Sequence, residues 1–288
     1  MKNFKLFSLC AMAAFAMALN TSCSKDEDTT PTEVIGTGTD FKVVRDKDNN
    51  TVQLDKFSWG NDTYEYYYNA SGKLNKMIMK ESGQTYKPTV INNNFEVLYN
   101  ETTGDGITTN WKTEIKLDNN DNITSYHAEE NQKKKTDSYK LEEDVTFKYD
   151  HNQITNVEIT GKQVQNTNGS PSTVNYKITI KFTWKSGNID EGEVLALVGD
   201  KEERGTIYFS YNTYTELKSN QMPFNLVVYG ILGGYAQSAQ FKCLIPLIGF
   251  GNPTKNAPSY VNGQSMYVST NSDGTISSEG SCSYTYKD

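Results

Sequence analysis

The residues with the clearest chemistry lie at the start of the chain, where a short leader ends in a cysteine. Lys2 and Lys5 precede an apolar run from Leu6 to Leu19, and three small or polar residues then lead to Cys23. This order is typical of a bacterial lipoprotein signal, in which the leader is cleaved and the cysteine is acylated. The apolar run is shorter than the roughly 20 residues that a membrane span needs. We therefore expect residues 1–22 to be removed and Cys23 to carry acyl chains.

Aromatic side chains that could hold a ligand are concentrated in one segment. Tyr64, Tyr66 and Tyr68 alternate on one face of a predicted strand, and Trp59 is close by in the sequence. Aromatic faces stack on the apolar faces of sugar rings, and tyrosine hydroxyls bond to sugar hydroxyls. These four residues are the candidate ligand platform, and a glycan is the favoured ligand class. The alternative is that the same tyrosines form a core face with cross-strand aromatic pairs.

One loop has oxygen ligands at the spacing of a calcium site. Asp118, Asn120 and Asn122 alternate, and Glu129 follows. However, Ile123 stands where such a loop needs glycine, and strands instead of helices are predicted on either side. A hairpin turn accounts for the same residues, so calcium is only the weaker alternative and no metal site is predicted.

The remaining cysteines and the histidines suggest no catalytic centre. Beyond Cys23, the predicted mature chain holds Cys243 and Cys282, which could form a disulfide in an exported protein or remain as two free thiols. The only histidines, His127 and His151, fit no metal-binding or hydrolase motif, and no nucleotide-binding loop occurs. We therefore predict no catalytic residues and no cofactor, and expect the protein not to be an enzyme.

The charge of the chain argues against nucleic acid as a partner. The whole sequence has a net charge of −7, and removing the two lysines of residues 1–22 leaves 26 Lys and Arg against 35 Asp and Glu, a net charge of −9. Nucleic acids and anionic membrane surfaces attract basic proteins.

Alternation of apolar and polar residues predicts the elements that position these side chains. The clearest apolar series is Val174, Tyr176, Ile178, Ile180, Phe182 and Trp184, with polar residues between its members. A period of two with one polar face indicates antiparallel strands that are solvated on one side. Strands of this kind end repeatedly in turns rich in Asn, Asp and Gly, as at Asp150-His151-Asn152 and Lys185-Ser186-Gly187-Asn188, so each turn is predicted to join a hairpin. The prediction is an all-β fold: an antiparallel meander forming a strongly curved sheet or a half-open up-and-down barrel.

Residues 222–251 break this pattern. The segment is apolar and rich in glycine, with a Val227–Gly234 run and a second apolar run at Leu244–Ile248. Polar residues and two prolines interrupt it, which argues against a membrane span. We expect a short helix and loop that pack against the concave side of the sheet.

Three parts are predicted along the chain. Residues 1–22 form the signal peptide, residues 23–40 are a polar, flexible tether, and residues 41–288 form a single β-meander domain.

The chain resembles a known but uncharacterised family. Its Tyr-Asn/Asp-x-x-Gly hairpins, the stretch Pro253–Ser259 and the terminal Ser283-Tyr284-Thr285-Tyr286 resemble lipoproteins of the Bacteroides group that have a porin-like, half-open β-barrel fold. The acidic run Ser24–Asp28 resembles the surface-export signal of that group. The resemblance implies an outer-membrane, lipid-anchored protein on the cell surface, and it supplies no activity or catalytic residues.

These observations favour a non-enzymatic binding or scaffold module. Its expected partners are the membrane, through the N-terminal lipid, and a glycan; nucleic acid is not expected, and no oligomeric state is predicted. Two alternatives remain: a carrier of a lipid or small apolar molecule in a half-barrel cavity, and a hydrolase with a carboxylate pair that the sequence does not reveal.

Overall fold

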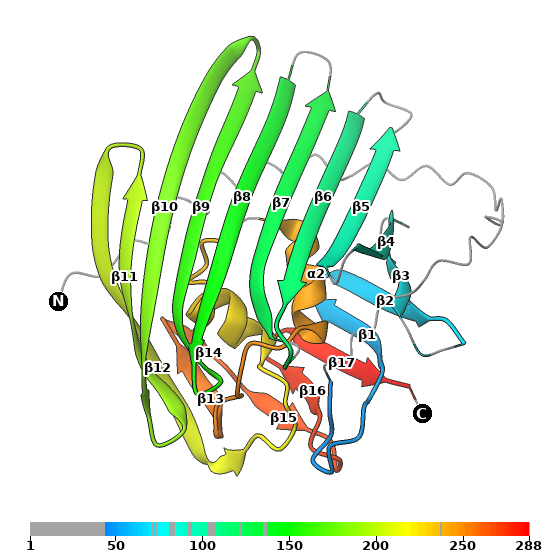
Figure 1. Cartoon of the computed structure of the whole chain (residues 1–288), viewed down its shortest axis with the longest axis vertical. Helices are drawn as coiled ribbons and strands as arrows, with labels where there is room; N and C mark the ends of the chain where they lie inside the picture. Colours follow the sequence, from blue (N-terminus) through cyan, green and yellow to red (C-terminus); the bar gives the residue numbers. More distant parts are fainter. Residues whose placement is uncertain are drawn as a thin grey trace.

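The protein is a single large antiparallel sheet curved around a short helical segment (Figure 1). The computed structural model describes residues 44–287, with gaps at 71, 73, 81–83, 92–93, 103–106, 121, 135–136 and 237. The first nine strands are β1 Leu54–Trp59, β2 Asp62–Tyr68, β3 Leu74–Met79, β4 Gln84–Ile91, β5 Asn94–Thr102, β6 Ile107–Leu117, β7 Ile123–Lys134, β8 Asp137–Asp150 and β9 Gln153–Thr167. The other eight are β10 Ser170–Lys185, β11 Asn188–Val198, β12 Lys201–Glu216, β13 Asn256–Val261, β14 Gln264–Ser265, β15 Val268–Thr270, β16 Ile276–Glu279 and β17 Cys282–Tyr286.

The strand order is that of a meander. Each strand from β1 to β14 pairs with the next in the sequence, and β15 pairs with β16, which pairs with β17. The last strand, β17, returns to pair with β1, so that β1 lies between β2 and β17. The sheet does not close into a barrel. The predicted all-β, antiparallel, half-open fold is therefore confirmed.

The long strands have one buried and one solvated face, as their alternation predicts. In β8, Val145 and Phe147 are buried, whereas Thr146 and Lys148 between them are exposed. Most exposed positions on the outer, convex face of β8–β10 are charged: Glu142, Asp144, Lys148, Lys162, Lys177 and Lys181. The concave face therefore holds the core and the convex face meets water.

The turns between the long strands have the backbone geometry that their residues favour. At the β8–β9 turn, His151 has φ of 48° and Asn152 has φ of 61°. At the β10–β11 turn, Ser186 and Gly187 have φ of 53° and 82°. Two-residue turns with positive φ match the twist of antiparallel strands, so the predicted hairpins form at these sites.

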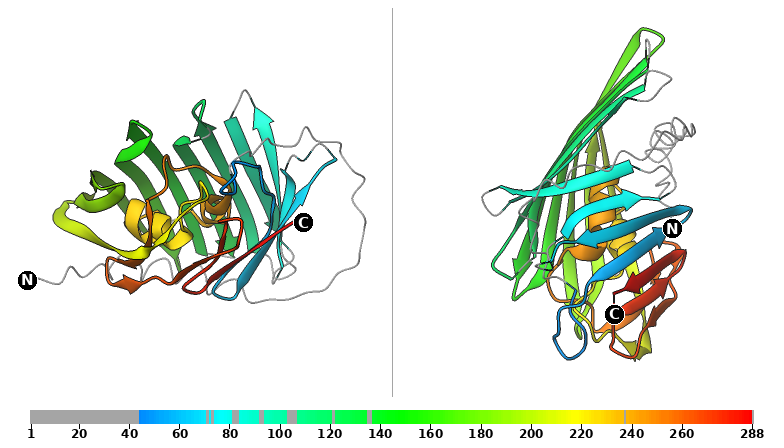
Figure 2. Two further views of the ribbon diagram at one scale, coloured as in Figure 1. Left: turned by 90° about the horizontal axis from the view of Figure 1, so that it is seen from below. Right: turned by 90° about the vertical axis from the view of Figure 1, so that its right-hand side faces the viewer.

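The segment of residues 222–251, here called the plug, fills part of the concave face (Figure 2). It contains a π-helical turn η1 (Leu226–Ile231), the helix α2 (Ala239–Leu244) and a 3-10 turn η2 (Ile245–Leu247). Phe241 of α2 stacks on Tyr126 of β7 with ring centroids 3.8 Å apart, and Phe250 meets Phe147 of β8 edge-on at 5.8 Å. The predicted helix and loop on the concave side are therefore confirmed.

A buried carboxylate holds the first turn of the plug. Glu279 of β16 accepts hydrogen bonds from the Phe224 and Asn225 backbone N–H groups and from the Tyr284 hydroxyl. Asn225 is the residue that starts η1, so the carboxylate lies at the N-terminal end of this turn. Burial raises the pKa of Glu279 to about 7, although the three hydrogen bonds act in the opposite direction.

In the part of the chain that the structure describes, no helix is long and apolar enough to cross a membrane.

Candidate binding surfaces

The tyrosines predicted as a ligand platform lie in the core. Tyr64 is 7% exposed and Tyr66 is 1% exposed, because their face of β2 is the concave face. Tyr68 is partly buried, and its hydroxyl donates to the Leu54 carbonyl at 2.9 Å. Trp59 packs beside Phe224 of the plug with ring centroids 5.2 Å apart. An exposed row of rings is therefore wrong for this strand, and the alternative of a core face agrees with the structure.

The proposed calcium ligands are separated in space. The Asp118 carboxylate accepts from the Asn120 and Asn122 backbone N–H groups at 2.8 and 2.9 Å, which is a hairpin turn held by its own side chain. Glu129 lies seven residues beyond Asn122 along β7, about 23 Å away at the rise of a strand. The four residues therefore cannot share one ion. Among the described residues, no group of three His, Cys, Asp or Glu side chains is arranged to hold a metal.

The same loop instead fixes the end of the plug. The Asn122 side chain donates to the Asn152 side-chain oxygen at 2.7 Å, and its own oxygen accepts from the Gly251 backbone N–H at 3.0 Å. Asn152 in turn donates to the Asn252 side chain at 2.7 Å. These hydrogen bonds join the β6–β7 turn, the β8–β9 turn and the end of the plug at one end of the central strands.

Cys23 lies outside the described residues, as do the signal peptide and the tether. Cys282 is a free, buried thiol, and the Asn225 side chain donates to its sulfur at 3.6 Å. Burial, followed by the nearby charge of Glu279, raises the pKa of the Cys282 thiol. Because Cys282 is a free thiol, the possible disulfide between Cys243 and Cys282 is not formed, and the alternative of a free thiol agrees with the structure at Cys282. The side chain of Cys243 is outside the described part.

Exposed tyrosines occur elsewhere, on the outer face of β12 to β15. Tyr208 is 63% exposed, Tyr260 is 41% exposed and Tyr267, between β14 and β15, is 79% exposed. We call these three residues, with Ser210 and Ser265, the tyrosine surface. Tyr208 and Tyr260 belong to the neighbouring strands β12 and β13, and Tyr267 follows β14. The residues next to the three tyrosines, Ile207, Val261 and Met266, are buried.

The strand register brings these rings close together. Tyr260 pairs with Ser210 on one side and with Ser265 on the other. Tyr208 lies two residues before Ser210 and is therefore a diagonal neighbour of Tyr260. Tyr267 lies two residues after Ser265, just beyond the end of β14. Diagonal neighbours in a sheet are about 7–8 Å apart, within reach of aromatic side chains. Three exposed rings with hydroxyl side chains between them therefore share one patch, and Glu191 of β11 pairs with Tyr208 at its margin.

None of these tyrosines was predicted as a site residue, although the sequence of β12 contains a signal for this surface. In β12, Ile207, Phe209 and Tyr211 alternate with Tyr208, Ser210 and Asn212. The first series is the more apolar, which assigns Tyr208 to the solvated face. Tyr214 continues the solvated series and is 97% exposed, but a break in register separates it from the tyrosine surface.

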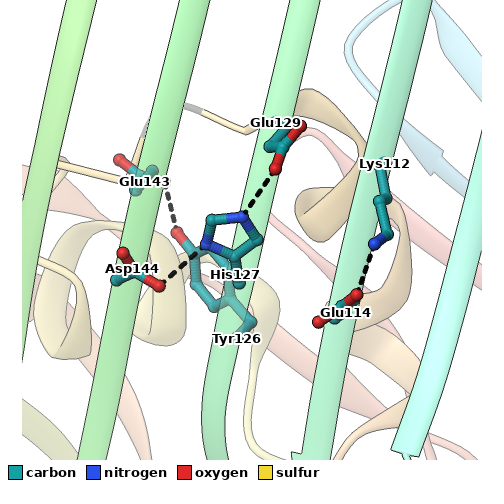
Figure 3. Close-up of polar contacts among 7 residues, drawn as sticks. All are labelled: Lys112, Glu114, Tyr126, His127, Glu129, Glu143 and Asp144. Atoms are coloured by element: carbon teal, nitrogen blue, oxygen red, sulfur yellow. Dashed lines mark hydrogen bonds and ion pairs between the residues drawn. The ribbon is translucent and has the colours of Figure 1, made fainter.

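Two polar clusters lie back to back on β7 and β8 (Figure 3). On the concave side, the Glu143 carboxylate accepts from the Tyr126 hydroxyl at 2.5 Å and from the Tyr176 hydroxyl at 2.7 Å. The Tyr176 ring crosses β9 over Gly161, where an added Cβ would lie 2.2 Å from the ring. Burial, and then the charge of Glu143, raise the pKa of both tyrosines, so that both hydroxyls remain donors. The Ser238 backbone N–H of the plug also points to this carboxylate, at 3.4 Å.

On the convex side, His127 lies between two carboxylates (Figure 3). Its Nδ1 is 2.8 Å from Asp144 Oδ1, and its Nε2 is 3.2 Å from Glu129 Oε1. Partial burial alone would lower the pKa of His127, but the two carboxylates outweigh it and raise the pKa. The arrangement favours a protonated histidine in a surface ion-pair network.

Comparison with known proteins gives likenesses of shape only. No protein-family model matches the chain, and no curated protein matches it. A porin-like protein from Bacteroides vulgatus ATCC 8482 has 12% identity and a TM-score of 0.49, over 82% of this chain and 99% of that chain. A porin-like protein from Bacteroides uniformis ATCC 8492 has 11% identity and a TM-score of 0.40, over 82% of this chain and 95% of that chain. Similarity this distant carries no argument about binding or activity.

Proposed function

We propose that this protein is a lipid-anchored, outer-membrane protein of the cell surface that binds glycans without catalysing a reaction. The observation that carries the proposal is the tyrosine surface: three exposed rings on β12, on β13 and just after β14, with serine hydroxyls between them. Exposed aromatic groups on a rigid sheet are suited to stacking on sugar rings, while neutral hydroxyls can bond to sugar hydroxyls. The leader that ends at Cys23 and the acidic run after it support the anchor and the surface location.

The filled concave face supports surface binding over the carrier alternative. Where the plug lies, Leu226, Val227, Ile231 and Phe241 are buried against the sheet, each at 0% exposure. An apolar ligand in that region would have to displace the plug. The convex face is charged and solvated, so it is not suited to insertion into a bilayer. This supports a domain that is held at a membrane by its lipid alone.

Binding of soluble glycans to the purified full chain, measured by calorimetry, tests the proposal. Tyr208→Ala and Tyr260→Ala should each weaken binding by about 1 kcal/mol, roughly fivefold in Kd, because each removes one stacking ring. The matched control is Tyr214→Ala, a tyrosine of the same solvated series outside the tyrosine surface, and it should bind as the unmodified chain does. Failure to bind any glycan of a diverse panel, or equal losses in all three variants, would reject the proposal.

A further inference from the structure

The concave face changes character beyond the plug. Nearer the plug, the inward residues of β8 and β9 are apolar, as in Val145, Phe147 and Ile159. Beyond Glu143, polar side chains take over, and Glu130, Gln132 and Gln163 are exposed by only 6%, 7% and 8%. The long strands β6–β10 continue past the plug at this end (Figure 1).

These polar residues lie in two adjacent rows across the sheet. In the first row Glu130 pairs with Trp111 on one side and with Leu141 on the other. In the second row Gln132 pairs with Thr109 and with Tyr139. Gln163 hydrogen-bonds the Tyr139 hydroxyl and so connects the rows. The result is a buried patch that combines a carboxylate, two amides and two aromatic rings.

One atom in this patch points to a missing hydrogen-bond donor. The Gln132 side-chain oxygen is buried and has no hydrogen-bond partner among the described residues. Buried acceptors in folded proteins are almost always paired, so an unpaired one calls for an explanation. A ligand group that donates a hydrogen bond would satisfy this oxygen, as a buried water would.

The charges nearby indicate the nature of that group. Glu130 is two residues from Gln132 on the same face of β7, and Glu143 lies diagonally across from Glu130 on β8. Both carboxylates act on the Tyr139 hydroxyl, where burial and these two charges raise its pKa. The Glu143 carboxylate already accepts from Tyr126 and Tyr176 and contributes its charge only. Glu130 and the Gln132 oxygen are acceptors, and Trp111 and Tyr139 offer ring faces that attract cations.

We propose that the concave face beyond the plug is a second binding site, which takes a ligand carrying an ammonium group. Glu130 supplies the counter-charge and the Gln132 oxygen accepts one of the N–H bonds. The rings of Trp111 and Tyr139 contact the carbon atoms next to the nitrogen. An amino sugar or an aliphatic diamine has this chemistry.

Calorimetry on the purified full chain at constant ionic strength tests this site with matched pairs of probes. Putrescine should bind at least tenfold more tightly than 1,4-butanediol, and glucosamine more tightly than glucose, since each pair differs in the amino group. Glu130→Gln should weaken putrescine binding at least tenfold, and Gln132→Leu should weaken it severalfold. Glu129→Gln is the control, because Glu129 is the next residue of the same strand but faces outward beside His127.

Two further measurements keep the result interpretable. Thermal unfolding checks that each variant is folded. If the Glu130→Gln variant does not fold, hydrogen exchange of the unmodified chain replaces the binding measurement on that variant. Putrescine should then slow exchange in β6–β8, and 1,4-butanediol should not. Amines that bind no better than their neutral partners, or equal losses in Glu129→Gln and Glu130→Gln, would overturn the proposal. Tyr208→Ala should leave amine binding unchanged, so this site and the proposed glycan surface can fail separately.

Discussion

Tyrosine side chains lie in three environments in this protein, and the register of each strand decides which. Tyr66 is part of the core, and Tyr126 and Tyr176 donate to a buried carboxylate. Tyr208 and Tyr260 are exposed on the opposite face of the sheet. The same residue type can therefore support the fold in one strand and present a binding surface in another.

The contrast between a buried and an exposed tyrosine gives a first prediction. Tyr66→Ala should lower the free energy of unfolding by about 3–5 kcal/mol, because it removes a fully buried ring. Tyr208→Ala should change it by less than about 0.5 kcal/mol, because its ring is mostly in water. Urea unfolding of both variants measures the difference. Similar losses in the two variants would contradict the assignment of faces.

A second prediction concerns the glycine beneath Tyr176. Gly161→Ala should cost about 1–3 kcal/mol of stability, because the new methyl group would displace the Tyr176 ring from its path to Glu143. Thr160→Ala, at the neighbouring exposed position, is the control and should have little effect. Chemical unfolding of both variants compares them. A Gly161→Ala chain as stable as the unmodified one would show that the ring does not cross the strand there.

Among the elements, the strands could be predicted from the sequence and the contacts of the plug could not. Alternation in β8 and β10 reports directly which residues face the core, and the Asn, Asp and Gly residues of the turns report their positive φ. Tyr64 and Tyr66 belong to one hydrophobic core cluster with residues of the plug, which lies more than 150 residues later in the chain. Local patterns contain no information about such distant contacts. The sequence alone therefore could not decide whether the face of β2 that carries these rings is buried or exposed.

The carboxylate that holds the plug gives a prediction about pH. Because the pKa of Glu279 rises from 4.5 to about 7 on folding, the folded protein binds this proton more tightly than the unfolded chain does. The contribution of Glu279 to stability is therefore greatest below pH 4.5 and is lost as the pH rises through 7. Glu279→Gln should reduce the difference in unfolding free energy between pH 5 and pH 8 by up to about 3 kcal/mol.

Urea unfolding at the two pH values provides this measurement. Glu142→Gln, at an exposed position of β8, is the control and should retain the pH dependence of the unmodified chain. If Glu279→Gln also retains it, another group is responsible for the pH response of the protein.

For the whole molecule, the proposed lipid anchor and the described β domain are separate features. The concave face is filled or polar and the convex face is charged, so we expect attachment to a membrane to depend on Cys23. Cys23→Ala should release the protein into the soluble fraction or leave it uncleaved, as cell fractionation with immunoblotting would reveal. A Cys23→Ala protein of normal mature size that still fractionates with membranes would reject the lipid anchor.

The pairing of β1 with β17 has a consequence for biogenesis. Leu54 lies opposite Tyr286, so one side of the first strand stays unpaired until a strand more than 200 residues later in the sequence has been synthesised. Glu279 and Tyr284, which hold the plug, also come from this final part of the chain. Contacts between residues so far apart in sequence make folding slow, and the open strand edges would be prone to aggregation in the meantime. If the protein is exported as proposed, its early strands therefore need protection, for example by a chaperone, until β17 has followed them.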